Sequence, residues 1–118
     1  MIAAVRRDTL RYRAAWLLHR ASGVAVLLFL LLHVVDVALV QAGPGAFDAL
    51  LLVYRHAVFR ALEILLMGAV LFHAFNGLRL TVQDFWSGWL AVERPMLMAV
   101  YLLTLAAWLP AAFFMATR

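Results

Sequence analysis

Three long runs of apolar residues dominate the sequence, and each is long enough to cross a lipid bilayer as a helix. We place them at residues 21–41, 59–80 and 95–117. A spanning helix needs roughly 20 apolar residues. With 68% hydrophobic and 14% charged residues in a chain of 118, there is too little polar material to cover a water-soluble fold. The sequence therefore predicts an all-α integral membrane protein with one transmembrane domain, residues 1–118.

The basic residues predict the orientation of the spans. Residues 1–20 hold five arginines interleaved with Tyr12 and Trp16, a pattern typical of a basic amphipathic segment on an anionic membrane surface. Arg79 and Arg94 add positive charge near the loop between the second and third spans. By the positive-inside rule, the N-terminus is then cytoplasmic. The net charge of +4 thus indicates topology and not nucleic-acid binding.

The chain contains no cysteine, which restricts the redox chemistry open to it. A c-type haem attached through Cys-x-x-Cys-His, an iron–sulfur cluster held by this chain and a disulfide framework are all excluded. A redox role therefore requires a cofactor that is bound without a covalent link.

His73 is the first candidate for such a cofactor, because it lies inside the second span. Gly77, four residues on, shares a helix face with it and leaves a surface without a side chain. A neutral imidazole is an axial ligand of b-type haem, and Arg79 on the same helix can pair with a haem propionate. A histidine that only bonds a neighbouring helix, with Gly77 serving close packing, fits the spacing equally well.

A second cluster, His19, Arg20, Ser22 and Gly23, lies at the inner end of the first span. Its imidazole and guanidinium can bind propionates or a quinone carbonyl, although a basic helix end that reaches toward lipid phosphates has the same pattern. Trp16 belongs to an aromatic belt and can also flank a quinone.

His33 lies deeper in the membrane than His73. It is ~20 Å along the helix axis from Arg20, whereas His73 is only ~9 Å from Arg79 at the same side of the membrane. The two histidines are therefore poor candidates for ligands of one iron. His33 either pairs with Asp36 three residues on, ligates a second haem, or bonds to a neighbouring helix.

Two motifs in this order resemble those of a known family. His19-Arg20-Ala21-Ser22-Gly23 is similar to the His-Arg-x-Ser-Gly motif of succinate dehydrogenase cytochrome b subunits. The segment from His73 through Gly77 and Arg79 to Asp84 resembles the family's second motif, one helical hairpin further on.

The resemblance implies a haem b whose axial ligand in this chain is His73, with the other ligand supplied by a second hydrophobic anchor subunit. It implies further that His19, Arg20 and Arg79 lie near the propionates, and that Arg20 and Asp84 border a quinone pocket. Ser22 and Trp16 are additional candidates for that pocket, and His33 for cofactor binding.

Two departures from the family pattern point to the quinone. Trp16 stands where members with a ubiquinone pocket commonly have serine, and Leu80 stands where histidine often follows the arginine. Together with His33, these changes resemble the high-GC Gram-positive and Thermus-like members, for which menaquinone is the expected electron acceptor.

The resemblance implies the membrane anchor of succinate dehydrogenase (succinate:quinone oxidoreductase, complex II) in the bacterial cytoplasmic membrane. Such an anchor performs no carbon chemistry. It forms a helical bundle with the second anchor subunit and binds the iron–sulfur and flavoprotein subunits, while association of whole complexes stays open. The alternatives are an anchor of quinol:fumarate reductase and a cofactor-free membrane scaffold.

Overall fold

The chain is almost entirely helical in the part that the structure describes. The structure is a computed structural model that describes the backbone of residues 2–118 and the side chains of residues 9–86, 88 and 91–118. The elements are α1 (Ile2–Val40), α2 (Pro44–Tyr54), α3 (Ala57–Phe85), the 3-10 helix η1 (Ser87–Val92) and α4 (Glu93–Thr117). Three helices, α1, α3 and α4, are long and apolar enough to cross a membrane. The predicted all-α membrane fold is therefore confirmed.

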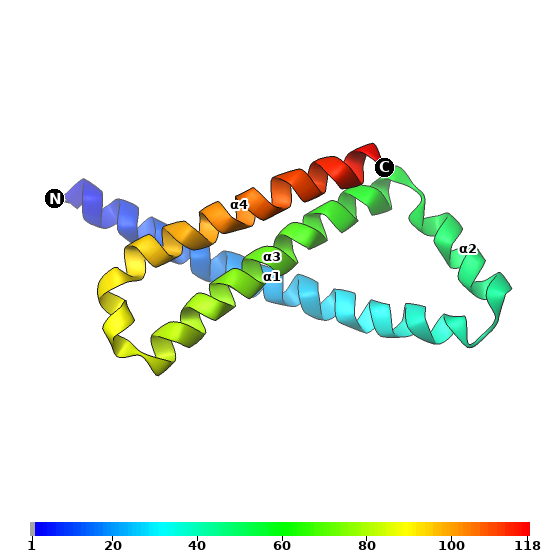
Figure 1. Cartoon of the computed structure of the whole chain (residues 1–118), viewed down its shortest axis with the longest axis horizontal. Coiled ribbons are helices and arrows are strands. Elements are labelled where there is room, and N and C mark those ends of the chain that lie inside the picture. Colours follow the sequence, from blue (N-terminus) through cyan, green and yellow to red (C-terminus); the bar gives the residue numbers. More distant parts are fainter. Residues whose placement is uncertain (1) are drawn as a thin grey trace.

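Helix α1 is one continuous helix of 39 residues, ~58 Å long at 1.5 Å per residue. The sequence predicts an interfacial arm up to residue 20 and a span from residue 21, but the helix has no break there. The reason is local, since no proline occurs before Pro44 and the glycine nearest the division, Gly23, does not by itself end a helix. The basic N-terminal end therefore extends past the point where α1 crosses α3 (Figure 1).

A short helix joins the far ends of α1 and α3, between the predicted spans 21–41 and 59–80. Gly43 ends the turn after α1 with φ of 111°, a conformation that favours glycine, and Pro44 takes the first position of α2. The following apolar residues continue the helix to Tyr54. With 11 residues, α2 is too short to span a bilayer and serves as a connection.

Helices α3 and α4 lie side by side along their length (Figure 1). Trp108 of α4 packs on Gly68 of α3 and donates its indole N–H to the Ile64 carbonyl at 2.8 Å. At the C-terminal end, Arg118 and Glu63 form an exposed ion pair of 3.8 Å. The contact at Gly68 brings the two backbones close because glycine offers no side chain there.

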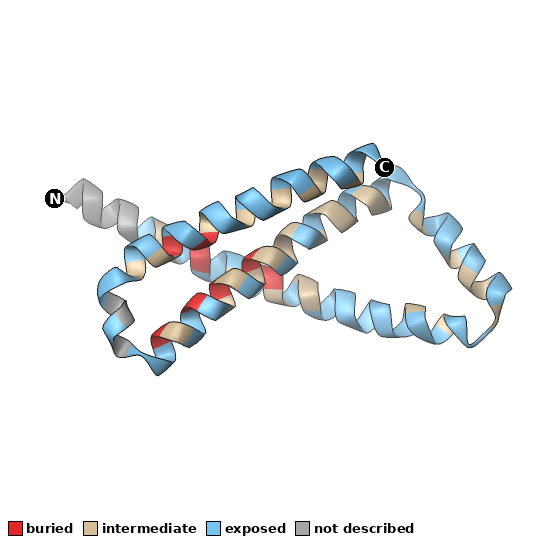
Figure 2. Cartoon of the chain, viewed as in Figure 1, coloured by how far each residue is buried: buried red, intermediate tan, exposed pale blue. Residues whose placement is uncertain are grey.

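The buried residues gather where the three long helices meet, toward the η1 end of the bundle (Figure 2). Half of them are polar or charged, and the large apolar side chains of α1 face outward. This arrangement is the reverse of that in a water-soluble protein and suits a chain surrounded by lipid and other helices. The buried side chains are Ala15, Ser22, Phe72, Asn76, Arg79, Gln83, Leu97 and Val100.

We expect Gly68→Ala to weaken the packing of α3 on α4. An added Cβ would lie 2.9 Å from the Trp108 ring, which is closer than real contacts allow. Overpacking of this kind lowers the free energy of unfolding by about 1–3 kcal/mol. Thermal unfolding of the detergent-purified protein, followed by circular dichroism, measures the loss. Gly45→Ala is the control, because nothing lies within 4 Å of its added Cβ; equal stability of the two variants would contradict the prediction.

Candidate functional site: the histidine pair

The two motif histidines meet where α1 crosses α3. The imidazole rings of His19 and His73 stack with centroids 4.3 Å apart and planes 13° from parallel. Each ring also lies over a glycine of the other helix: a Cβ added at Gly23 would be 3.1 Å from His73 Cε1, and one added at Gly77 would be 3.8 Å from His19 Cε1. Gly77, which the sequence analysis places beside His73, thus faces His19, and Gly23 makes room for His73.

Hydrogen bonds determine which ring nitrogen of His73 carries the proton. Its Nδ1 lies 3.3 Å from the His19 carbonyl oxygen, which can only accept, and 3.1 Å from Ser22 Oγ. The Ser22 hydroxyl donates to the same carbonyl at 2.9 Å. All three contacts are satisfied only when Nδ1 of His73 is the donor. A neutral His73 then keeps an unprotonated Nε2, the nitrogen that can bind a metal.

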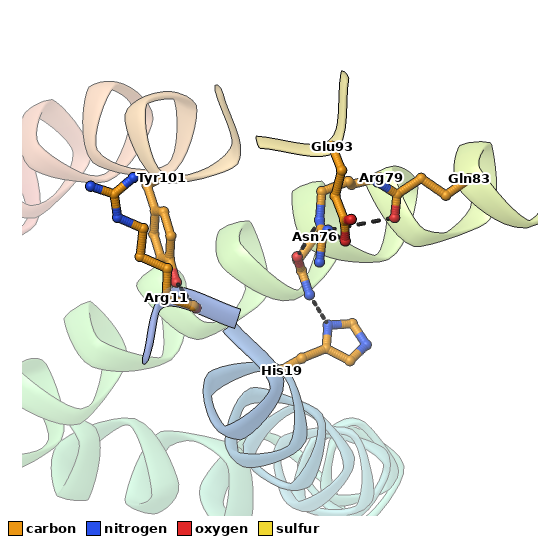
Figure 3. A network of polar contacts seen from close by, with 7 residues as sticks. All are labelled: Arg11, His19, Asn76, Arg79, Gln83, Glu93 and Tyr101. Carbon is orange, nitrogen blue, oxygen red and sulfur yellow. Dashed lines mark hydrogen bonds and ion pairs between the residues drawn. The ribbon is translucent and has the colours of Figure 1, made fainter. Parts of the chain in front are cut away.

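The same reasoning gives His19 the opposite tautomer. Arg79 donates from Nε to Asn76 Oδ1 at 3.0 Å, so the amide nitrogen of Asn76 faces the other way and lies 3.0 Å from His19 Nδ1 (Figure 3). Since an amide NH₂ only donates, His19 Nδ1 accepts. A neutral His19 then carries its proton on Nε2, which points away from Asn76 in Figure 3.

Arg79 is a buried cation whose charge is compensated within the chain. Its side chain is 6% exposed and lies 3.6 Å from the Glu93 carboxylate, and it donates to Gln83 Oε1 at 3.5 Å (Figure 3). Glu93 begins α4, so the ion pair connects α4 to α3. A buried arginine without such partners would be strongly destabilising.

The remaining predicted site residues lie outside this cluster. Arg20 is exposed, and its guanidinium carbon lies 4.8 Å from the centre of the Trp16 ring, a cation–π contact. Asp84 is exposed near the end of α3. Among the described residues, no group of three or more His, Cys, Asp or Glu side chains is placed to hold a metal ion.

His33 and Asp36 have separate surroundings near the far end of α1. His33 is exposed, and its ring stacks on Phe29 of the same helix with centroids 5.3 Å apart. Asp36 accepts a hydrogen bond of 2.7 Å from the Tyr54 hydroxyl of α2. This bond is the main cause that raises the pKa of Tyr54 to about 12, with burial and the carboxylate charge adding to it. Asp36 thus bonds to Tyr54 of α2, and the role of His33 stays a prediction.

Sequence reasoning did not assign a site role to the residues that support the histidines. These residues are Asn76, Gln83 and Glu93. The spacing of four between Arg79 and Gln83 was an available signal, because it places the two on one helix face. The link from Arg79 to Glu93 depends on how α4 packs and has no counterpart in local spacing.

The three apolar helices and the buried polar contacts at their crossing define a multi-pass, all-α membrane protein. The chain belongs to the succinate dehydrogenase/fumarate reductase transmembrane subunit family, which it matches over residues 4–114. It is similar to the succinate dehydrogenase 2 membrane subunit SdhC of Mycobacterium tuberculosis (strain ATCC 25618 / H37Rv), with 37% identity over 97 residues. That match covers 82% of this chain and 71% of the relative. The family predicted from the two motifs is confirmed, and the chain is a membrane subunit of a multi-subunit complex.

We expect the Tyr54–Asp36 bond to stabilise the connection between α1 and α2. The pKa of Tyr54 is raised above the usual value near 10, so the bond contributes fully below pH ~10 and is lost as the pH rises through about 12. At pH 8, Tyr54→Phe and Asp36→Asn should each lower the thermal unfolding temperature. The double variant should be no less stable than the worse single variant, because both changes remove the same bond. Additive losses would contradict this interpretation.

Proposed function

We propose that the chain is the haem b-binding membrane anchor subunit of a succinate dehydrogenase, which donates the axial ligand His73 and helps to form the quinone site. The observation that carries this proposal is the tautomer of His73. Its Nδ1–H is held by the His19 carbonyl and Ser22, the arrangement usual for metal-binding histidines, and Nε2 is left with a lone pair. Gly23 makes room for this ring, and a Cβ there would press on it.

One haem ligand from this chain requires a second from another subunit. His19 stacks face to face with His73, whereas two imidazoles that bind one iron point their nitrogens at each other across the metal. His33 lies ~21 Å further along α1 than His19. We therefore assign the second axial ligand to the companion anchor subunit. Bound in this way, a b-type haem supplies a one-electron redox centre inside the membrane.

The groups around His73 divide into donors that are in use and donors that are available. Ser22 is buried, and its hydroxyl is occupied by His19 and His73, so we propose that it supports the ligand and does not contact quinone. His19 Nε2–H and the exposed Arg20 are available to a propionate or a quinone carbonyl. With Trp16 and Asp84 they make up the proposed quinone site, and menaquinone is the proposed substrate.

We propose the cytoplasmic membrane of a bacterium as the location, with the N-terminus in the cytoplasm. The N-terminus and η1 lie at one end of the bundle, and α2 and the C-terminus at the other (Figure 1). Arg11, Arg13 and Arg20 lie toward the first of these ends, and Arg94 beside η1 adds to them. The positive-inside rule then places that end in the cytoplasm, where the iron–sulfur and flavoprotein subunits bind.

The exposed surface of α1 supports a companion in the membrane. No residue in the most apolar part of α1 is buried within this chain, whereas α3 and α4 pack on each other. We propose that the second anchor subunit covers α1 and completes a larger helical bundle. Electrons from succinate then pass through the flavin and clusters of the other subunits to quinone at the cytoplasmic boundary, and this subunit carries out no carbon chemistry.

Two alternatives have different consequences. An anchor of a quinol:fumarate reductase would use the same site in the opposite direction, and measuring the direction of electron flow in the intact complex distinguishes it. A cofactor-free scaffold would use the polar residues only to hold helices together. It predicts a complex without b-type absorbance.

We expect His73→Ala to abolish the b-type haem signal of the purified complex, because it removes the iron ligand donated by this chain. His33→Ala is the matched control and should leave the signal intact. Dithionite-reduced minus oxidised spectra and extracted haem measure both. Partial loss with each variant would indicate two haems, and a quinone-active wild-type complex without haem would refute the ligand assignment.

The glycines offer a finer test of the same site. Gly23→Ala should displace His73, since its Cβ would lie 3.1 Å from Cε1, whereas Gly77→Ala makes only an ordinary contact of 3.8 Å with His19. We expect a changed electron paramagnetic resonance spectrum of the oxidised haem, or lower haem content, in the first variant alone. Equal effects of the two changes would show that Gly23 does not determine the position of the ligand.

A further inference from the structure

We infer that Asn76 is a positioning residue that holds His19 with its proton on Nε2, so that His19 offers a hydrogen-bond donor to a carboxylate or carbonyl oxygen beside His73. The inference rests on the proposed function for the identity of that acceptor. In this inference Asn76 and Arg79 act through His19 and do not touch the cofactor or the quinone.

Arg79 determines which atoms donate and which accept in the two hydrogen bonds that link it through Asn76 to His19. A guanidinium has donors and no acceptor, so the side of Asn76 that meets Arg79 Nε must be the carbonyl oxygen, at 3.0 Å. The opposite amide orientation would set two donors against each other. The NH₂ group consequently faces His19 Nδ1, at 3.0 Å, and that nitrogen must accept. No other assignment of protons satisfies both bonds.

Burial makes this polarity costly to change. Asn76 is 1% exposed, and among the described residues only Leu97 has a comparably buried large side chain. A buried amide without partners is destabilising, because it loses its hydrogen bonds to water and gains none in the protein. A leucine of similar volume would fill the same space but would leave Arg79 Nε and His19 Nδ1 without this partner, so packing alone does not explain an asparagine here. The amide accepts from Arg79 and presents its donor to His19.

Gln83 and Glu93 hold the Arg79 guanidinium in place. Gln83 accepts from it at 3.5 Å, and the Glu93 carboxylate lies at 3.6 Å on the first turn of α4. The guanidinium therefore cannot rotate away from Asn76 without losing the compensation of its charge. The sequence of contacts from Glu93 through Arg79 and Asn76 to His19 links all three long helices.

The two stacked rings therefore have different proton positions and different functions. His73 is held with an unprotonated Nε2, which binds a metal, and His19 is held with a protonated Nε2, which donates. The two rings stack with centroids 4.3 Å apart and planes 13° from parallel, so the donor of His19 and the ligand nitrogen of His73 belong to one ring pair. A random tautomer at His19 would present a lone pair to an oxygen part of the time and repel it.

Nitrogen NMR of the histidine rings tests this inference directly. The complex is purified with ¹⁵N-histidine and reduced with dithionite, so that a low-spin ferrous haem is diamagnetic, and His19 is assigned by the loss of its signals in His19→Gln. In wild type we expect an unprotonated Nδ1 and a protonated Nε2. A protonated Nδ1 in wild type would overturn the inference without any variant.

Two substitutions separate polarity from packing. In Asn76→Asp the carboxylate still accepts from Arg79 but cannot donate, so His19 Nδ1 should change to the protonated form. In Asn76→Leu both ring nitrogens should shift toward the average of the two tautomers. Thr81→Val is the control, since it removes a hydroxyl that donates only to the Gly77 carbonyl, and it should leave His19 unchanged. An unprotonated Nδ1 retained in Asn76→Asp would overturn the inference.

The haem content of the same samples distinguishes a failure of the proposed function from a failure of the role assigned to Asn76. A wild-type complex without b-type haem refutes the proposed function. Unchanged His19 resonances in Asn76→Asp, with haem present, refute the role of Asn76 and leave the ligand assignment of His73 in place.

Discussion

The close crossing of α1 and α3 at two histidine–glycine contacts is the constraint on which the rest of the structure depends. Each helix places a histidine over a glycine of the other, so the backbones approach closely and the two rings stack between them. The contacts are unequal, because His73 fits tightly against Gly23 while His19 has more space at Gly77. The tighter contact belongs to the proposed ligand, whose position matters most.

Burial of polar groups gives this crossing its specificity. Apolar side chains gain little by leaving lipid for another apolar surface, so helices in a membrane are selected by close packing and by hydrogen bonds. Ser22, Asn76 and Arg79 are each more than nine-tenths buried and each has a partner on another helix or along its own. A different rotation of α1 or α3 would leave these groups unpaired in an apolar medium, which is far more costly than a loss of apolar contact.

The sequence predicts the helices well because hydropathy and length alone determine what a bilayer accepts. The two motifs also predict that His19 and His73 serve one cofactor, whereas the contact of Ser22 with His73 comes from the structure. Spacing within one helix places Gly77 on the face of His73 but cannot show that the ring opposite Gly77 is that of His19. Nor can it show that Glu93 reaches Arg79, because this contact depends on the return of the chain through η1. Helix α2 was missed since a short apolar segment after a Gly-Pro pair fits a loop equally well.

The pairing of Arg79 also bears on which cation serves the cofactor site. The resemblance to the family suggests Arg79 near the propionates. Its Nε, however, donates to Asn76, and its Nη1 donates to Gln83 and forms an ion pair with Glu93. The charge is compensated, and its electrostatic effect on an anion nearby is correspondingly reduced. Arg20, in contrast, is exposed. Its described contact is the face of Trp16, which leaves its N–H donors available. On this reasoning Arg20 is the proposed cation for the anionic or carbonyl oxygens, whereas the proposed task of Arg79 is to fix the proton of His19 through Asn76.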